Sequence, residues 1–207
     1  MSRGVLTIVS GFAGSGKGTI MKRLLSEYDG YALSVSATTR DPRPGEREGV
    51  EYFFKSREEF EEMIRKDAFL EYAQYVGHYY GTPMSYVDEK LSEGKNVILE
   101  IEVQGALKVK ERRPDSLLVF LTPPGAQELE RRLRGRGTET DEVIVRRMKR
   151  ASEESELMSL YDYVLVNDDI DRTTGELHQI IQTARFAAVR SQDLIRRLQS
   201  ELKKYAD

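Results

Sequence analysis

The chain has 207 residues, 39% of them hydrophobic, which is enough for one good core and favours a single compact domain with insertions. Lysine and arginine number 32 against 35 acidic residues, so the net charge of -3 provides no positive field for nucleic acid and disfavours a dedicated nucleic-acid binder. The absence of cysteine excludes disulfides, thiol catalysis and cysteine zinc sites. No apolar run has the length of a secretory signal or a membrane span, so we expect a cytoplasmic protein without membrane contacts.

Short apolar runs alternate with helical patterns along the chain. The runs that predict buried strands are residues 5–9, 31–35, 97–101, 117–121 and 163–166. The patterns that predict helices are residues 19–27, 103–112, 126–134 and 142–158. This order is typical of βαβ units, so the expected fold class is α/β, with helices flanking a parallel sheet.

Two segments interrupt the alternation. Residues 36–91 hold 10 of the 18 aromatic residues and contain several turn formers, which predicts an inserted subdomain. Residues 127–156 are rich in arginine and glutamate, and the glycines at 135 and 137 separate two helices, which predicts a hinged lid. The core of the single domain would then comprise residues 1–35, 92–126 and 157–207.

The last segment, residues 172–204, predicts one long helix with apolar side chains near one face. Such a face is expected either to pack on the core or to contact another subunit. A homo-oligomer formed through this C-terminal helix is therefore one of the two interpretations.

A phosphate-binding loop follows the first predicted strand. The sequence there matches G-x-x-x-x-G-K between a strand and a helix, which is the context that makes this pattern specific. Converging backbone N–H groups and the positive end of the helix bind an anion, and Lys17 would reach the outer phosphates of a triphosphate. The residues of the predicted nucleotide loop are Gly11, Phe12, Ala13, Gly14, Ser15, Gly16, Lys17, Gly18 and Thr19. Gly18 occupies the position of the usual magnesium-binding hydroxyl, so no direct metal ligand is assigned.

The chain resembles the guanylate kinase family from Val5 to about Asp169. The resemblance is carried by the loop and by the strings SVSATTRDPR (34–43), GVEYFF (49–54), FLEYAQ (69–74), YYGT (79–82), QG (104–105), GRGTET (135–140) and VND (166–168). It implies a P-loop nucleoside monophosphate kinase fold in which residues 36–91 bind GMP. The implied reaction is transfer of the γ-phosphoryl group of ATP to GMP, with Mg²⁺, giving ADP and GDP.

The resemblance also assigns the acceptor site. Arg40 and Arg43 lie three residues apart in a proline-bounded loop, where two guanidinium groups can bind one phosphate, and Tyr52 and Tyr80 can each donate a hydroxyl. Alone, such arginines would usually be solvated. The residues implied to contact guanine are Ser36, Glu71, Thr82 and Glu102. Ionised Glu71 can accept from the N1–H and amino groups of guanine, which adenine does not offer in this pattern, so we expect GMP or dGMP as acceptor.

Phosphoryl transfer depends mainly on alignment and charge neutralisation, so arginines should dominate catalysis. The resemblance places Arg132, Arg136 and Arg147 in the lid over the ATP phosphates, beside Lys17 and Arg40, with Asn167 near the adenine ring. The alternative for most charges of this segment is a salt-bridged, solvated helix pair. Glu100 and Glu102 stand where the family commonly has aspartates. They keep the charge but extend the reach toward guanine and toward a magnesium-bound water.

Two other functions share this fold. A catalytically silent guanylate-kinase-like module would bind phosphopeptides through the GMP-phosphate site, but such modules typically have a degraded phosphate loop, whereas Gly16 and Lys17 are intact here. The Gly-Lys-Gly-Thr string also resembles adenylate kinases, which would imply another monophosphate as acceptor. The ATP:GMP kinase is the favoured interpretation.

Overall fold

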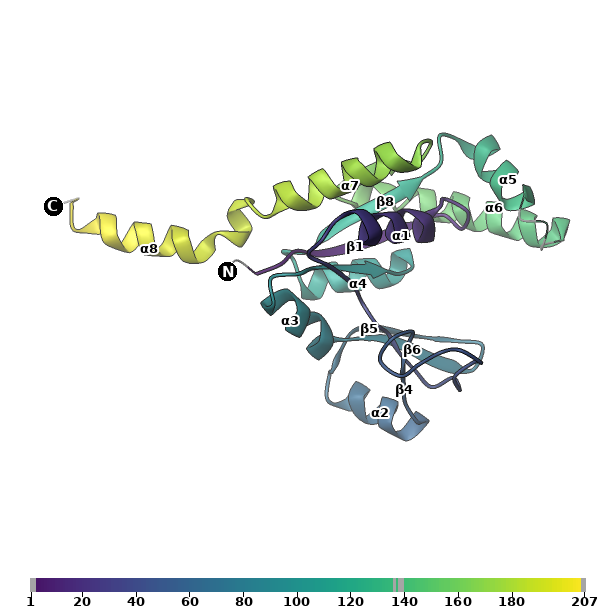
Figure 1. Cartoon of the computed structure of the whole chain (residues 1–207), viewed down its shortest axis with the longest axis horizontal. Coiled ribbons are helices and arrows are strands. Elements are labelled where there is room, and N and C mark those ends of the chain that lie inside the picture. Colours follow the sequence, from purple (N-terminus) through teal and green to yellow (C-terminus); the bar gives the residue numbers. More distant parts are fainter. Residues whose placement is uncertain (1–2, 136, 138–139, 206–207) are drawn as a thin grey trace.

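The structure, a computed structural model, describes residues 3–135, 137 and 140–205. A five-stranded sheet and its helices form the larger part of the molecule, and a smaller four-stranded sheet lies to one side (Figure 1). All strand pairs of the large sheet are parallel, which confirms the expected α/β class.

The large sheet has the order β2-β7-β1-β8-β9, so the strand that leads into the glycine loop lies at its centre. Its strands are β1 (Leu6–Gly11), β2 (Tyr31–Leu33), β7 (Asn96–Glu100), β8 (Leu117–Thr122) and β9 (Tyr163–Val166). All five predicted strands are therefore present, although β2 is shorter than expected. Because side chains alternate along a strand, Leu6 and Ile8 of β1 contribute to one hydrophobic cluster and Val9 to the cluster on the opposite face.

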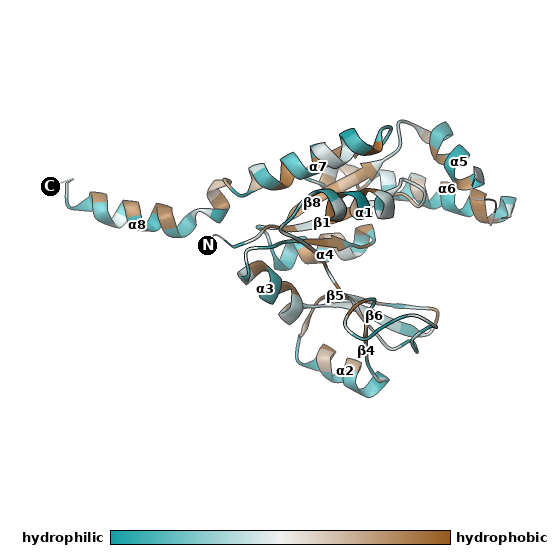
Figure 2. Ribbon diagram, viewed as in Figure 1, coloured by the Kyte–Doolittle hydropathy of each residue, from teal (hydrophilic) through white to brown (hydrophobic). Residues whose placement is uncertain are grey.

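Helices cover both faces of this sheet. One face packs against α1 (Lys17–Glu27) and α7 (Ile170–Ala184) through Ile20, Leu24, Leu177 and Ile181. The other face packs against α3 (Met84–Ser92), α4 (Val103–Arg112), α5 (Ala126–Gly135) and α6 (Asp141–Ser155), followed by the short η1 (Met158–Leu160). The brown strands between teal-faced helices in Figure 2 show the same layering. The carboxyl ends of β1 and β7 are thereby left as the open edge where α/β proteins bind ligands.

The smaller sheet is built by the segment between β2 and β7. It contains β3 (Ala37–Thr38), β4 (Phe53–Phe54), β5 (Phe69–Tyr75) and β6 (His78–Pro83) in the order β4-β3-β6-β5. Helix α2 (Arg57–Arg65) starts at a capping box made by Ser56 and Glu59, and its Phe60 stacks on Phe69. This separate aromatic core explains the high aromatic content of the segment.

The prediction of a single helix over 172–204 is wrong. Helix α7 ends at Ala184, and η2 (Ala188–Arg190) separates it from α8 (Gln192–Lys203). Two arginines of the break reach backbone carbonyls of the core: Arg185 donates to Gly94 O at 3.0 Å and Arg190 to Gly4 O at 2.5 Å. These tertiary bonds occur where the chain leaves the helical conformation. Helix α8, all of which the structure describes, buries no side chain and projects away from the core (Figure 1). The expected packing on the core is therefore confirmed for the α7 part of the segment and wrong for the α8 part.

Within the described residues, each helix is too short or too polar to cross a bilayer.

Candidate active site

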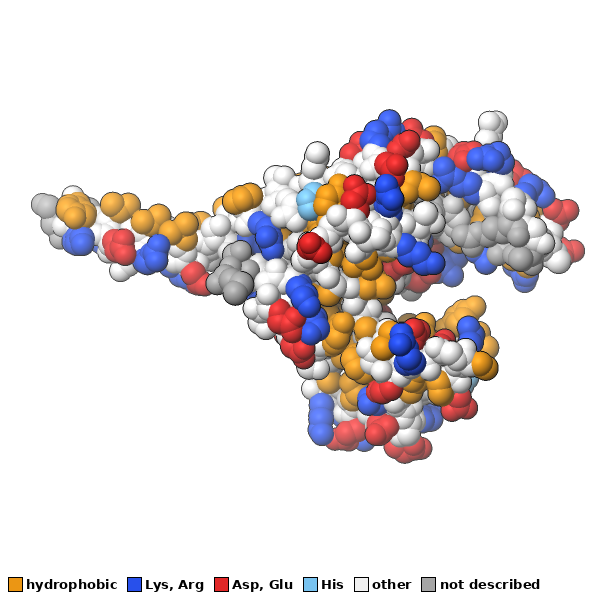
Figure 3. All heavy atoms as spheres, in the orientation of Figure 1, with side chains coloured by type: hydrophobic (Ala, Val, Ile, Leu, Met, Phe, Trp, Pro, Cys, Tyr) orange, Lys and Arg blue, Asp and Glu red, His pale blue; other side chains and the backbone are white. Residues whose placement is uncertain are grey.

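A cleft of about 310 Å³ opens between the two sheets. Figure 3 shows the hollow between the smaller sheet and the rest of the molecule. The lining residues include five of the predicted site residues, and the full set is Lys17, Leu33, Ser34, Ser36, Glu51, Tyr52, Glu100, Ile101 and Glu102. The cleft therefore joins the glycine loop to the segment for which an acceptor site was predicted.

The loop between β1 and α1 has the backbone geometry of an anion site. Gly16 caps α1 with φ +93°, a left-handed conformation in which a side chain would be strained. A Cβ at this position would lie 2.3 Å from Asn167 Nδ2, so Asn167 packs directly on the loop. The Lys17 ammonium donates to Gly11 O at 2.5 Å and Phe12 O at 3.2 Å, which folds its side chain along the loop. The positive end of a helix that begins at such a loop favours the binding of an anion.

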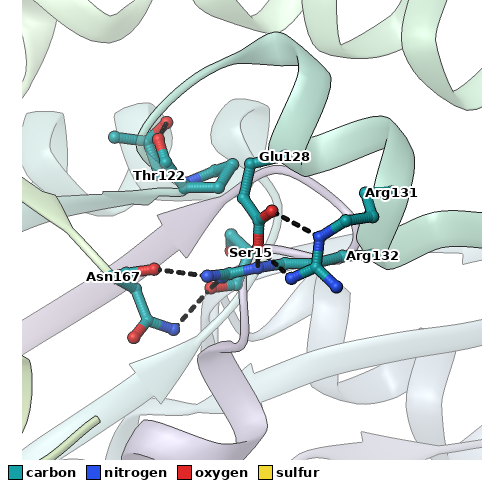
Figure 4. Close-up of polar contacts among 7 residues, drawn as sticks. Ser15, Thr122, Glu128, Arg131, Arg132 and Asn167 are labelled. Atoms are coloured by element: carbon teal, nitrogen blue, oxygen red, sulfur yellow. Dashed lines mark hydrogen bonds and ion pairs between the residues drawn. The ribbon is translucent and has the colours of Figure 1, made fainter. Parts of the chain in front are cut away.

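Arg132 and Asn167 form a hydrogen-bonded group beside this loop (Figure 4). Asn167 is 4% exposed, and its Nδ2 donates to Ser15 O at 2.8 Å. Arg132 Nη2 donates to Asn167 O at 2.8 Å, and Arg132 Nε donates to Glu128 at 2.7 Å. The guanidinium groups of Arg131 and Arg132 lower the pKa of Glu128 to about 2, so this carboxylate is ionised at neutral pH. Arg132 thus links α5 to the nucleotide loop.

Arg40, Tyr52 and Tyr80 form a second cluster, at the smaller sheet. The Arg40 guanidinium lies 5.4 Å from the centre of the Tyr52 ring, and the Tyr52 and Tyr80 rings meet edge to face with centroids 6.1 Å apart. Arg40 also donates to both carboxylate oxygens of Glu46 at 2.9 Å. Arg43 has an exposed side chain, while its backbone N–H donates to the same Glu46 at 2.8 Å. Glu46 therefore holds the turn that carries both arginines.

Glu71 lies deeper in the smaller sheet, on β5. Thr82 on β6 donates its hydroxyl to Glu71 Oε1 at 2.7 Å. Burial raises the pKa of Glu71, and the Thr82 hydrogen bond acts in the opposite direction. A Cβ built on Gly105 would lie 3.2 Å from Glu71 Oε2, so the first turn of α4 approaches this carboxylate closely.

Glu100 and Glu102 follow one another at the carboxyl end of β7. Burial raises the pKa of Glu100, and the charge of nearby Lys17 acts in the opposite direction. Glu102 is the N-cap residue of α4, and its Oε2 accepts a 2.6 Å hydrogen bond from Arg150 of α6. Among the described residues, no group of three or more His, Asp or Glu side chains is arranged to hold a metal ion.

The remaining predicted residues are placed less completely. Arg147 lies on α6, half-buried. Arg136 lies outside the described residues. The sequence did not predict a role for Glu46 or Arg150. Glu46 accepts hydrogen bonds from the predicted site residues Arg40 and Arg43, and Arg150 donates one to Glu102. The spacing of Glu46, three residues after Arg43 and six after Arg40, was the only signal for the first, and the second had none.

Comparisons with known proteins agree with this geometry. The family model described as guanylate kinase matches residues 3–184. A protein of Streptococcus thermophilus (strain CNRZ 1066) named guanylate kinase is 53% identical over 189 residues, covering 91% of this chain and 90% of its own. One from Caldanaerobacter subterraneus subsp. tengcongensis with the same name is 48% identical, covering 96% and 97%. The crystal structure of guanylate kinase from Anaplasma phagocytophilum has a TM-score of 0.69 and 31% identity, covering 92% and 90%.

The parallel sheet, the glycine loop and the cleft beside the inserted sheet define an ATP-dependent nucleoside monophosphate kinase of the P-loop class. Within that class the chain belongs to the guanylate kinase family. Its reaction is the transfer of the γ-phosphoryl group of ATP to GMP. No observation favours the silent phosphopeptide-binding module.

Proposed function

We propose that the two ends of the cleft divide this reaction between donor and acceptor. ATP would bind along the loop of residues 11–19, with Arg132 and Asn167 beside its base, and GMP or dGMP would bind against the smaller sheet. The reacting phosphates would then meet near Lys17 and Glu100, which both line the cleft. In-line transfer needs this alignment more than it needs covalent chemistry from the protein.

The observation that carries the acceptor assignment is the pair formed by Glu71 and Thr82. A carboxylate whose second oxygen faces the first turn of α4 can accept from the N1–H and amino groups of guanine, while the Thr82 hydroxyl keeps the carboxylate oriented. Adenine would leave this carboxylate without those donors. Arg40, Arg43, Tyr52 and Tyr80 would hold the GMP phosphate, and Ser36 would contact the base.

We propose that Mg²⁺ accompanies ATP. The described residues provide no cage of carboxylates, which fits an ion held mainly by nucleotide phosphates and water. Glu100, which lines the cleft together with Lys17, would accept hydrogen bonds from waters of that ion. When bound, the ion supplies charge neutralisation on the transferring phosphates.

Charge on the transferred group would also be offset by Lys17, Arg40, Arg136 and Arg147. The lid (residues 127–156) would supply the last two on closing, while the acceptor subdomain (residues 36–91) closes from the other side of the core. Closure excludes water that would otherwise hydrolyse ATP.

Lys17→Ala tests the division of the cleft. Isothermal titration should show GMP affinity close to that of the unmodified protein, and turnover with ATP and GMP should be abolished. A variant that loses GMP affinity and keeps ATP affinity would show that the two substrates have been assigned to the wrong ends.

The protein is further proposed to act in the cytoplasm and to pair with a second copy through α8. Leu194, Leu198 and Leu202 follow one another at four-residue intervals on this helix, and they are 47%, 44% and 61% exposed. Orange side chains run along the projecting helix in Figure 3. A 12-residue helix without tertiary packing is only marginally stable in water, so this face needs a partner.

A second copy fits because α8 is complementary to itself. In an antiparallel pair centred on Leu198, Leu194 of each copy lies opposite Leu202 of the other. These contacts repeat in both directions, as a two-fold axis requires. Sedimentation analysis should therefore give a dimer for the unmodified protein, a monomer for Leu198→Glu, and a dimer for the control Gln199→Glu. A monomeric unmodified protein, or one that binds anionic vesicles through α8 instead, would refute the pairing.

A further inference from the structure

The ion pair between Arg150 and Glu102 joins two parts of the molecule that are 48 residues apart in the sequence. Arg150 lies on α6, in the predicted lid, and Glu102 is the N-cap residue of α4 at the edge of the cleft. The Arg150 Nη2 atom is 2.6 Å from Glu102 Oε2. Arg150 was not among the predicted site residues.

Arg150 is itself held from a second side. Its Nε donates at 2.8 Å to Glu154, one helical turn further along α6, whose side chain is 13% exposed. A guanidinium fixed by a largely buried carboxylate presents its remaining N–H groups in a defined direction, because the group is planar and rigid. Arg150 is therefore oriented toward Glu102 by its own helix.

Glu102 uses only one of its oxygens in this pair. Among the residues that the structure describes, none donates a hydrogen bond to Oε1. Glu102 lies one turn before Gly105, the residue that approaches Glu71 Oε2, so the first turn of α4 carries Glu102 toward the same space as Glu71. The free oxygen belongs to a residue that lines the acceptor end of the cleft.

The pair contributes little to folding. Arg150 and Glu102 are 61% and 72% exposed, and ion pairs between side chains this exposed contribute little to stability because water competes for both charges. A glutamate also has one more rotatable bond than the aspartate common at this position in the family, so an unpaired Glu102 would sample more rotamers. An ion pair with little effect on stability can still select the rotamer that meets a ligand.

We infer that Arg150 is a positioning residue that holds Glu102 for the second N–H of the guanine amino group. This inference rests on the proposed guanine site. Glu71 takes the N1–H and one amino hydrogen, Arg150 occupies Glu102 Oε2, and Glu102 Oε1 accepts the other amino hydrogen. IMP carries the same ring N1–H but lacks the amino group. The arrangement therefore favours GMP over IMP.

The test compares kcat and KM for GMP and IMP, at saturating ATP and Mg²⁺, in Arg150→Met, Arg150→Lys and Glu102→Gln. Arg150→Met keeps the aliphatic stem and removes the donor, and we expect KM for GMP to rise roughly threefold to fivefold, the upper range for an exposed ion pair. Its kcat for GMP and its kcat/KM for IMP should remain those of the unmodified enzyme. Arg150→Lys should restore most of the preference for GMP. The control Arg146→Met removes another exposed arginine of α6, one without an ion pair to the described residues, and should change neither substrate.

A double mutant separates positioning from loss of charge. In a Glu102→Asp background, where the shorter side chain has fewer rotamers, Arg150→Met should raise KM for GMP by a smaller factor than it does in the unmodified enzyme. An equal fall in kcat/KM for GMP and for IMP in Arg150→Met, or an unchanged KM for GMP in that variant, would overturn the inference. Failure of the proposed guanine site gives a different result, because Glu102→Gln would then leave the preference for GMP over IMP unchanged.

Discussion

Arg40 and Glu46 form a closed ion pair in the loop that follows β3, with Arg40 Nη2 2.9 Å from each carboxylate oxygen. Their side chains are only 13% and 17% exposed. The backbone N–H of Arg43 is the main cause that lowers the pKa of Glu46, followed by the hydrogen bond from Arg40. One carboxylate thus orders the turn that carries both proposed phosphate ligands.

Glu46→Ala should weaken GMP binding. The arginines keep their charge, but the turn loses its anchor, and we expect KM for GMP to rise roughly tenfold, as for loss of a charge-assisted hydrogen bond of about 1.5 kcal/mol. Steady-state kinetics measures the effect. Glu48→Gln is the control, because Glu48 pairs with Lys55 and Phe54 N instead. A lower KM in Glu46→Ala would mean that Glu46 competes with the GMP phosphate.

Glu71→Gln should lower activity with GMP and raise thermal stability. Burial of an ionised carboxylate opposes folding, so the glutamine variant is expected to melt at a higher temperature at pH 7, while kcat/KM for GMP falls by about two orders of magnitude because the paired acceptors are lost. Differential scanning calorimetry and steady-state kinetics measure the two effects. Glu58→Gln, at an exposed position of α2, should change neither.

The pH dependence of Glu71 has a defined sign. Its folded pKa lies above the ordinary value of 4.5, so folding favours the protonated form. The stabilising contribution of this group is complete below pH 4.5 and is lost as pH rises through the folded pKa. The advantage of Glu71→Gln in melting temperature should therefore shrink as the pH is lowered toward 4.5. Affinity for GMP in the unmodified enzyme should fall over the same acidic range, and a pH-independent difference in melting temperature would contradict this account.

Gly16 and Gly18 form a matched pair for testing the loop. Gly16→Ala places a Cβ 2.3 Å from Asn167 Nδ2 at φ +93°, so we expect loss of ATP binding and destabilisation of about 1–3 kcal/mol. Gly18 lies in the first turn of α1 with no heavy atom within 4 Å of a built Cβ, so Gly18→Ala should stabilise the protein by about 0.5–1 kcal/mol. Thermal unfolding and ATP titration distinguish them. Equal behaviour of the two variants would show that Asn167 does not pack on the loop as described.

Local patterns predicted the parts of the molecule that local interactions determine. The buried strands appear as short apolar runs, and the glycine loop appears between a strand and a helix. The break in the C-terminal helix has no glycine or proline to announce it, and it coincides with bonds from Arg185 and Arg190 to carbonyls more than 90 residues away. Periodicity continues through the break, so a sequence pattern predicts one helix.

The same difference between local and long-range interactions applies to the candidate site. Arg40, Arg43 and the loop lysine stand in recognisable strings. The partnership of Arg150 with Glu102 joins residues 48 positions apart, and sequence spacing does not indicate that these two residues meet. Residues that orient other residues are therefore harder to predict than those expected to contact substrate directly.

The most direct measurement of the central claim is the initial rate with ATP and Mg²⁺ and each of GMP, dGMP, AMP, CMP and UMP as acceptor. The Glu71 and Thr82 arrangement predicts that both guanine nucleotides are phosphorylated far faster than the other three. Preference for AMP would contradict the acceptor assignment. An absence of turnover with every acceptor would contradict the claim that the protein is an active nucleoside monophosphate kinase.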